Sequence, residues 1–502
     1  MTTREVFAKY TTPETFERIK EYETVSEMWE NCLKQYPDAV AIEDDGKKYT
    51  YAQLEEDAAA FRTLLKTEGK ETMRVGIIAP NSYAFVKAYL ATVTLGCTAV
   101  ILPAQLDEMS VFGCTMLYGI EKLVYGEGME EKTKIVAAKR PDVQLISALA
   151  TSEKKTALAA AKGETPCVMM FTGGTTGKSK CAVLSNRAVM QGTVNGCYGL
   201  RDIFGERYLL VLPLSHVFGL IRNLMTALYT GSAMFICRNN KDMFRDIAMF
   251  RPTVLVFVPA LAEMSLMLSR KFGKNMLGDD LKYVICGAAA VSPFLIKEYK
   301  EKLNVELLAG YGLTESANLV SGNPESLHKP ESVGLFYPNQ EYKIVDGELW
   351  LKGKNMFDGY IGADVPAFED GWFRTGDLVR VDDEGFLYIT GRIKEIIVLS
   401  NGENVSPAEV ETHFNALPFI QDSQVFEAVN EQGTHILALE VVPRMSEVPA
   451  EGKENPVAFI TAELEKVNNS LPGYQRVSRI TVRQSDFERT PSMKIKRYTL
   501  QQ

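Results

Sequence analysis

The 502-residue sequence has few of the residues from which metal sites and disulfide frameworks are built. It contains four histidines and eight cysteines, and the cysteines are scattered through the first part of the chain without a C-x-x-C pair. The spacing of a zinc site is therefore absent, and a disulfide scaffold is not indicated. Free thiols fit a reducing compartment best, so the sequence predicts a cytoplasmic location.

Long apolar runs and blocks of basic charge are also missing. The most apolar stretch, residues 208–221, contains Ser215 and His216 and is shorter than the roughly 20 apolar residues that cross a bilayer. The N-terminus is polar and charged, unlike a signal peptide. A net charge of −9 argues against a general affinity for nucleic acid or anionic membranes. We therefore expect no nucleic-acid partner and no membrane span, and any nucleotide must be bound by local donors.

Short apolar segments alternate with helix-like segments in the first half of the chain. Helices are expected at 51–65, where Thr50 is a candidate cap, and at 82–95. Strands are expected at 74–79, 97–102, 122–125, 167–171, 254–258 and 283–286. Buried strands that alternate with helices form parallel sheets covered on both faces, and ligands gather beyond the carboxyl ends of such strands.

The pattern changes after about residue 334. Short strands at 341–345, 347–351 and 385–389, separated by turn pairs such as Asp346-Gly347, predict a small β-rich subdomain. From about residue 394, helices are expected at 406–415 and 456–469, and strands at 435–442 and 479–482. The prediction is an α/β protein with a large N-terminal domain, residues 1–393, of mainly parallel sheets flanked by helices, and a small α+β C-terminal domain, residues 394–502.

The most distinctive local feature is a segment rich in glycine and threonine that follows the expected strand at 167–171. It reads FTGGTTGKSK from Phe171 to Lys180. Glycines let backbone N–H groups approach an anion closely, and hydroxyl and lysine side chains add donors and charge. The segment is not a Walker A loop, because Thr172 stands where that pattern requires its first glycine. Taken alone, the segment is either a phosphate-binding loop or a surface loop of small residues.

Together with later segments in the same order, this loop resembles the signatures of the adenylate-forming superfamily. That superfamily includes acyl-CoA synthetases, aryl-acid ligases, luciferases and the adenylation domains of nonribosomal peptide synthetases. The loop departs from the family pattern YTSGTTGKPKG at Gly173, Ser179 and Cys181. The other similar segments are LPLSHVFG at 212–219, GAA at 287–289, GYGLTES at 310–316, GELW at 347–350, WFRTGD at 372–377, GRIKE at 391–395, NGENVSP at 401–407, LPGY at 471–474 and RTPSMKI at 489–495.

The resemblance implies an ATP site. The β- and γ-phosphates would be held by Thr172, Gly173, Gly174, Thr175, Thr176, Gly177, Lys178 and Lys180. The adenine would be bound by Gly287, Ala288, Ala289, Tyr311 and Gly312. Thr314 would bind the α-phosphate, and Glu315 would bind Mg²⁺, a hard cation that prefers oxygen ligands. Asp377 would accept both ribose hydroxyls, and Arg392 would donate to the ribose.

The resemblance also implies catalytic and hinge residues. Lys494 is the candidate catalytic lysine, with Lys496 as the fallback because Met493 and Glu488 depart from the family pattern around it. His216 would form a wall of the acyl or thiol tunnel. In this family the C-terminal domain is mobile. It rotates about the residue that matches Lys394, and the rotation brings the loop of Gly402 towards pantetheine.

The implied function is the ATP-dependent activation of a small carboxylic acid to an acyl-adenylate, with release of pyrophosphate, and transfer of the acyl group to coenzyme A. The expected cofactors are ATP, Mg²⁺ and coenzyme A, or the phosphopantetheine of a carrier protein. The His-Val-Phe-Gly segment at 216–219 favours a medium-chain fatty or aromatic acid. Two alternatives stay open: a stand-alone adenylation enzyme that loads an acyl carrier protein, and a catalytically inactive nucleotide-binding regulator.

Overall fold

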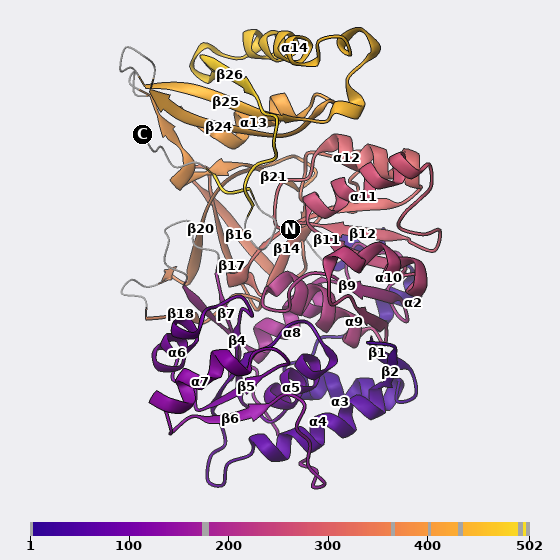
Figure 1. Ribbon diagram of the computed structural model, residues 1–502, viewed down its shortest axis with the longest axis vertical. Helices are drawn as coiled ribbons and strands as arrows, with labels where there is room; N and C mark the ends of the chain where they lie inside the picture. Colours follow the sequence, from indigo (N-terminus) through magenta and orange to yellow (C-terminus); the bar gives the residue numbers. More distant parts are fainter. Residues whose placement is uncertain are drawn as a thin grey trace.

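The computed structural model describes residues 4–172, 180–362, 367–399, 403–429, 435–489 and 495–497. These residues form an α/β structure with two large sheets and a smaller α+β unit at the C-terminal end. No helix in the described ranges is long and apolar enough to cross a membrane. Figure 1 shows the C-terminal unit at one end of the molecule and the sheet that contains β3 to β7 at the other.

One sheet has seven strands in the order β18-β8-β7-β4-β3-β5-β6. Their bounds are β3 (Arg74–Ile78), β4 (Thr98–Leu102), β5 (Lys122–Tyr125), β6 (Gln144–Ser147), β7 (Pro166–Phe171), β8 (Cys181–Ser185) and β18 (Gly359–Ile361). The central strands are parallel, whereas β8 runs antiparallel to β7 and β18 runs antiparallel to β8. The two antiparallel pairs bring residue 360 beside the end of the glycine-rich segment.

A second sheet of fourteen strands runs in the order β16-β17-β20-β21-β15-β14-β13-β12-β11-β9-β10-β1-β2, with β19 paired to β20. Its bounds are β1 (Val40–Asp44), β2 (Lys47–Thr50), β9 (Arg207–Leu210), β10 (Ala233–Ile236), β11 (Val254–Phe257), β12 (Tyr283–Cys286), β13 (Glu306–Leu313), β14 (Asn318–Gly322), β15 (Gly334–Phe336), β16 (Gln340–Val345), β17 (Glu348–Gly353), β19 (Phe368–Glu369), β20 (Trp372–Val381) and β21 (Phe386–Arg392). The first half of β13 pairs parallel with β12, and its second half pairs antiparallel with β14. The predicted β-rich region is therefore continuous with the parallel strands through β13.

The helices of the N-terminal part begin where the sequence offers caps. The Thr50 side chain accepts a hydrogen bond from the Gln53 N–H, and the Gln53 side chain accepts one from the Thr50 N–H, so α4 begins with a capping box. Ser82 caps α5 in a similar way. The helices are α1 (Arg4–Phe7), α2 (Pro13–Arg18), α3 (Val25–Gln35), α4 (Tyr51–Leu65), α5 (Tyr83–Thr94), α6 (Glu108–Leu117), α7 (Glu130–Lys139), α8 (Asn186–Asn195), α9 (Thr226–Tyr229), α10 (Met243–Phe250), α11 (Pro259–Phe272) and α12 (Pro293–Glu298), with π-helices at Phe218–Met225 (η1) and Tyr299–Leu303. Helix α8 contacts both sheets, because it touches β7 and β8 on one side and β14 on the other.

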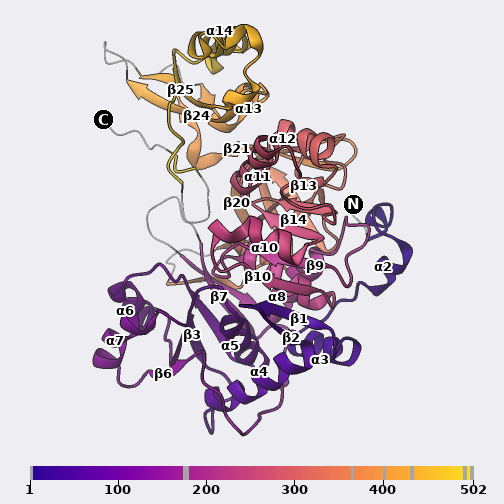
Figure 2. The ribbon, with the colours of Figure 1, turned by 45° about the vertical axis from the view of Figure 1, so that its right-hand side comes forward.

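The C-terminal unit has a hydrophobic core of its own. Strands β24 (Ile420–Val429), β25 (His435–Pro443) and β26 (Arg479–Val482) pack against α13 (Pro407–Asn415) and α14 (Pro456–Ser470), and the short strands β22 (Ile397–Val398) and β23 (Asn404–Val405) precede them. The core contains Val410, Phe414, Leu439, Ile460 and Leu464, all almost fully buried. In both ribbon views this unit lies beside α11 and α12 (Figures 1 and 2).

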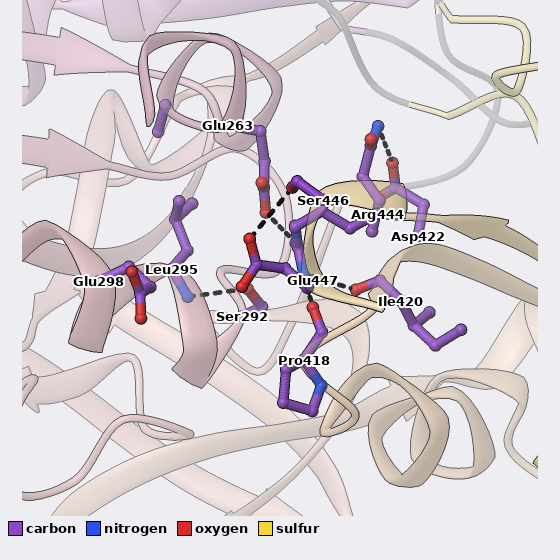
Figure 3. Close-up of polar contacts among 12 residues, drawn as sticks. Glu263, Ser292, Leu295, Glu298, Pro418, Ile420, Asp422, Arg444, Ser446 and Glu447 are labelled. Atoms are coloured by element: carbon purple, nitrogen blue, oxygen red, sulfur yellow. Dashed lines mark hydrogen bonds and ion pairs between the residues drawn. The ribbon is translucent and has the colours of Figure 1, made fainter. Parts of the chain in front are cut away.

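Ion pairs join the C-terminal unit to α11 and α12 (Figure 3). Arg444, which follows β25, donates from Nη2 to Oε1 of Glu263 on α11 at 2.7 Å. Arg270, at the end of α11, pairs both with Glu298 of α12 and with Glu447 of the C-terminal unit. Burial raises the pKa of Glu263, and the nearby Arg444 charge opposes that rise. The contact therefore depends on complementary charges that are largely withdrawn from water.

The main strands and helices lie where the sequence pattern predicts them. α4, β5, β12 and β26 have the predicted bounds, and the other predicted elements differ by one to three residues at their ends. Many elements had no prediction, among them α8, α11, β8, β20, β24, and the π-helix η1, which lies within the apolar stretch at 208–221 and beyond. A ten-residue strand with polar residues such as Gln421, Asp422 and Gln424 has no clear alternation of apolar and polar positions.

Candidate active site

The carboxyl end of β13 meets its neighbours so closely that only glycine fits. A Cβ atom at Gly312 would lie 2.5 Å from the Leu319 Cα atom, and one at Gly310 would lie 2.8 Å from the Leu319 Cδ1 atom. Between these glycines the pairing of β13 with β14 is irregular at Tyr311. The irregularity and the small neighbours leave the tyrosine side chain free to reach β20.

A hydrogen-bonded cluster forms where Tyr311 reaches β20. The Tyr311 hydroxyl donates to Oδ2 of Asp377 at 2.5 Å, and Arg392 Nε lies 2.6 Å from Oδ1. Asp377 and Arg392 are cross-strand partners on β20 and β21. Burial raises the pKa of Tyr311, and the Asp377 carboxylate raises it further. The cluster consists of the buried Asp377 carboxylate, the Tyr311 ring beside it and the Arg392 guanidinium. The Arg392 side chain is 44% exposed.

A second cluster lies where the glycine-rich segment ends. The Thr172 N–H donates to the Lys180 carbonyl at 2.8 Å, so the ends of the segment are joined. Lys180 Nζ lies 4.6 Å from the centroid of the Tyr360 ring, and the Tyr360 hydroxyl donates to Oε1 of Glu315 at 2.5 Å. Burial and the Glu315 carboxylate both raise the pKa of Tyr360. The Lys180 cation and the Glu315 carboxylate therefore flank the Tyr360 ring. The predicted phosphate-binding residues from Gly173 to Lys178 lie outside the described residues.

Thr314 and Glu315 form the 3-10 turn that directly follows β13. The Phe357 N–H donates to the Glu315 carbonyl at 2.8 Å and holds this turn beside β18. Ala317 ends the turn in the left-handed region, with φ of 58°. The turn therefore connects the two clusters, because β13 carries Tyr311 and the turn carries Glu315. In the described ranges no group of three or more His, Cys, Asp and Glu side chains could hold a metal.

The segment after β12 lies beside the same end of β13. A Cβ atom at Gly287 would lie 3.0 Å from the Gly310 carbonyl oxygen and 3.3 Å from the ring of Phe218. Ala288 adopts a left-handed conformation with φ of 68°, and Ala289 is exposed. The predicted adenine-binding segment therefore borders the site, and the aromatic ring of Phe218 lies against it.

His216 lies in the loop between β9 and η1. Its carbonyl accepts hydrogen bonds from the N–H groups of Gly219 and Leu220, at 3.0 and 2.9 Å. A side chain at Gly219 would collide with Pro213, so the loop and the start of η1 are tightly packed. The imidazole is half-buried, two residues before the Phe218 that contacts the Gly287 turn.

The predicted hinge and catalytic lysine lie at the junction with the C-terminal unit. Lys394 is exposed in a 3-10 turn, Ile393–Glu395, between β21 and β22. Arg497 ties the chain end to this junction, because it pairs with Glu395 at 3.1 Å and with Glu411 of α13 at 2.7 Å. Gly402 and Lys494 lie outside the described residues. The fallback residue Lys496 pairs with Glu488 at 3.3 Å, and both side chains are exposed.

Three residues near the site have contacts that the sequence did not predict. Nothing in the sequence indicated that the Tyr360 hydroxyl would bond to Glu315. Phe218 belongs to the segment at 216–219 from which the type of acid was predicted, and its contact with the Gly287 turn was not foreseen. Arg222 bounded the most apolar stretch and is nearly fully buried. Arg222 follows Phe218 by four residues, and this spacing was the one sign in the sequence that the two side chains lie on the same face of η1.

Comparison with known proteins places these features in a family. Residues 29–361 match the model of the family described as AMP-binding enzyme, and residues 394–502 match that of the AMP-binding enzyme C-terminal domain. The chain is 29% identical to 4-coumarate–CoA ligase-like 6 of Arabidopsis thaliana (85% of this chain, 80% of the relative) and 27% identical to oxalate–CoA ligase of the same plant (90% and 96%). The fold is similar to that of an anthranilate CoA ligase in complex with anthranoyl-AMP, with a TM-score of 0.82 at 19% identity over 95% of this chain and 96% of that one. The chain therefore belongs to the AMP-binding enzyme family of AMP-forming acid–thiol ligases.

Proposed function

We propose that this enzyme activates a carboxylic acid with ATP, releases pyrophosphate, and transfers the acyl group from the acyl-adenylate to coenzyme A. The observation that carries the proposal is the convergence of two clusters at the end of β13: Tyr311, Asp377 and Arg392 on one side, and Glu315 with Tyr360 and Lys180 on the other. The spacing of these groups along one strand and its following turn suits a nucleotide laid across the carboxyl ends of the strands.

The first cluster fits a nucleoside. A carboxylate accepts hydrogen bonds through both oxygens, so Asp377 can bind the two adjacent hydroxyls of a ribose. Arg392 is the exposed member of the cluster and lies over Asp377, so it is the group that moves aside or shares the carboxylate when the ribose binds. Tyr311 offers an aromatic face to the base. The turn at Ala288, which has a left-handed conformation, would lie along the edge of the base.

The second cluster fits phosphates and a divalent cation. Mg²⁺ is usually bound by one or two carboxylates together with substrate phosphates, so a lone Glu315 beside a phosphate-binding segment is a suitable donor set. The Tyr360 hydrogen bond fixes the orientation of this carboxylate. When bound, the cation neutralises charge on the phosphates. Thr314 and Lys180 would bind phosphate oxygens, and Lys494 would neutralise the charge that moves between the acid and the α-phosphate.

We also propose that the chain divides at residues 393 and 394 and that the C-terminal domain turns about Lys394 between the two half-reactions. The separate core of the C-terminal unit and the two family models support the division. A hollow of about 410 Å³, lined in part by Leu399 and Glu403, is a candidate path for pantetheine. It is lined by Leu399, Glu403, His435, Ile436, Leu437, Gly473, Tyr474, Arg476 and Ser478.

For the acid, we retain the expectation of a medium-chain or aromatic substrate, because Phe218 and Leu319 supply apolar surface beside the Gly287 turn. For the location, we retain the cytoplasm, because all eight cysteines are free and seven are buried. Reduced thiols persist in that compartment.

The test is pyrophosphate release from ATP and Mg²⁺ across a panel of carboxylic acids, each with and without coenzyme A. We expect release that depends on the acid and turns over repeatedly only when coenzyme A is present. Pyrophosphate release that stops after about one turnover per enzyme would contradict coenzyme A as the acyl acceptor and favour a carrier protein. ATP binding without release from any acid would contradict the activity and favour the inactive regulator.

A further inference from the structure

Arg222 is a buried cation that no carboxylate of the described chain neutralises. The residue is 2% exposed, and its Nε and Nη1 atoms have no hydrogen-bond acceptor. No ion pair in the described ranges includes it. A guanidinium keeps its charge at any pH that a folded protein experiences, so it cannot adapt by losing a proton. A buried charge of this kind requires an anion or strong acceptors to offset its lost hydration.

The groups nearest to Arg222 are neutral. The charge of Arg222 acts on Tyr208, Tyr337 and Cys197, and burial raises the pKa of each of them, to about 12 for Tyr337 and Cys197. The Tyr208 hydroxyl interacts with Arg222 but carries no charge. The carboxylate of Glu206 also acts on Tyr208, but it pairs with Lys282 at 2.6 Å. None of these groups supplies the missing negative charge.

A small cavity lies beside the guanidinium. It has a volume of about 20 Å³ and is lined by Arg222 together with Ile285, Leu308, Leu319 and Tyr337, among others. By the same measure one water needs roughly 10–15 Å³, so the space takes one or two atoms of a polar group, such as a carboxylate oxygen. The lining also includes the polar side chains of Tyr198, Asn323 and Tyr337.

The cavity lies directly below the acid-binding side of the proposed site. Ile285 and Leu308 are neighbours in register on β12 and β13, and Gly287 and Gly310 follow each of them by two residues, on the same face. Phe218, which contacts the Gly287 turn, is one turn before Arg222 on η1. Two strand residues span about 6.6 Å, so the level of Ile285 and Leu308 lies about that far along the strands from the glycines. Phe218 lies against Gly287, and Leu319 lies against Gly310 and also lines the cavity.

We propose that Arg222 binds a second anionic group of the acid substrate, at the end remote from the carboxylate that is activated. The inference rests on the proposed function and narrows its substrate to a medium-length or aromatic acid with a distal carboxylate. The chain of the acid would pass the glycines beside Phe218. The distal carboxylate would accept a hydrogen bond from Nε or from Nη1 of Arg222, two donors on opposite edges of the guanidinium that both lack acceptors.

The test compares acids in matched pairs that differ only at the remote end, a carboxylate against a methyl group, in aliphatic and benzene series. The wild-type enzyme should form acyl-CoA from the diacid with a kcat/KM at least about tenfold higher than from the matched acid that ends in a methyl group. This ratio is what one hydrogen bond to a charged group is expected to contribute. Arg222→Met should lower that ratio about 10- to 100-fold, whereas Arg222→Lys should lower it less. Arg245→Met, at an exposed arginine of α10 outside the cavity lining, should leave the ratio unchanged.

The outcomes separate the two proposals. If the wild-type enzyme uses the methyl partners as well as or better than the diacids, the inference is wrong while the ligase function stands. The same holds if Arg222→Met keeps the wild-type ratio. If no acid of either kind releases pyrophosphate, the proposed function itself fails. Should the methionine variant not fold, thermal unfolding of the wild-type enzyme with each acid decides, because only the diacids should raise its midpoint.

Discussion

At the scale of single residues, the contacts of Asp377 show what sequence motifs predict about a site and what they do not. The sequence named Tyr311, Asp377 and Arg392 separately, from three segments, and the structure joins them in one cluster. The hairpin between Asp377 and Arg392 indicates that they lie close, but equal distance from the turn would pair Asp377 with Gly391, and a register shift between Leu378 and Val379 places it opposite Arg392. The hydrogen bond from Tyr311 could not be predicted, since β13 reaches β20 only through the order of strands in the sheet.

Arg222 illustrates the opposite case. In the sequence it ends an apolar stretch, and a lone arginine in that position is usually exposed. Its burial follows from the position of η1, all eight residues of which are buried among α8, β9, β11 and β14. No pattern of apolar positions separates a π-helix from an α-helix over eight residues, so the depth of Arg222 was not predictable.

Lys494 can be tested against Lys496, which is two residues away and pairs with Glu488 at the surface. We expect Lys494→Ala to slow adenylation by roughly 10²–10³, the scale of one lost charge contact in the transition state. Formation of the thioester from supplied acyl-adenylate should persist, because the proposed rotation takes the lysine out of the site before that step. Pyrophosphate release and thioester formation are measured separately, and Lys496→Ala serves as the control. Equal loss of both half-reactions in Lys494→Ala would contradict the two-orientation proposal.

At the scale of elements, the β20–β21 hairpin positions Asp377 and Arg392, and its turn is held by Asp382. This carboxylate accepts hydrogen bonds from Lys329 Nζ at 2.7 Å, from the Phe386 N–H at 2.9 Å and from the Tyr388 hydroxyl at 3.1 Å. Burial alone would raise the pKa of Asp382, but these hydrogen bonds lower it to about 2. A pKa below the unfolded value means that the carboxylate stabilises the folded state above about pH 4 and loses that effect as the pH falls towards 2.

We expect Asp382→Asn to lower the free energy of unfolding by about 1 kcal/mol at pH 7, a lowering of the midpoint by about 2 °C in a chain of this size. The difference from the wild type should shrink between about pH 4 and pH 2, where the wild-type carboxylate becomes protonated. Thermal unfolding at a series of pH values measures it. Asp383→Asn, at the exposed neighbour, should change neither the free energy of unfolding nor its dependence on pH. A difference that stays constant down to pH 2 would show that the charge of Asp382 is not the cause.

At the scale of the whole molecule, the ion pair of Arg444 with Glu263 (Figure 3) and that of Arg270 with Glu447 hold the C-terminal domain against α11 and α12. Such contacts can form in only one of the two orientations that the proposed mechanism needs. A contact made in one state alone shifts the population between the two states by its own free energy.

The double variant Glu263→Gln, Glu447→Gln removes both acidic partners across this interface and leaves the hydrogen bonds of Arg444 to the Pro418 and Ile420 carbonyls. We expect the rates of adenylation and thioester formation to change in opposite directions, so that their ratio shifts about fivefold, which corresponds to about 1 kcal/mol. Rapid mixing with each half-reaction measured alone gives the ratio. Glu463→Gln, at an exposed pair on α14, is the control. A parallel change in both rates would mean that the interface does not select an orientation.

By itself the sequence determined the kind of fold, several strands and helices of the N-terminal part, and the family, because these depend on short-range patterns: buried strands, caps such as Thr50, and glycines at close approaches. Only the tertiary structure decided that the β-rich region continues the parallel sheet through β13, that Tyr360 bonds to Glu315, and that Arg222 is buried beside a cavity. Each of these depends on which strands become neighbours and which face of a helix turns inward. Strand order and helix facing are set by the packing of segments far apart in the chain, and local residue patterns do not encode them.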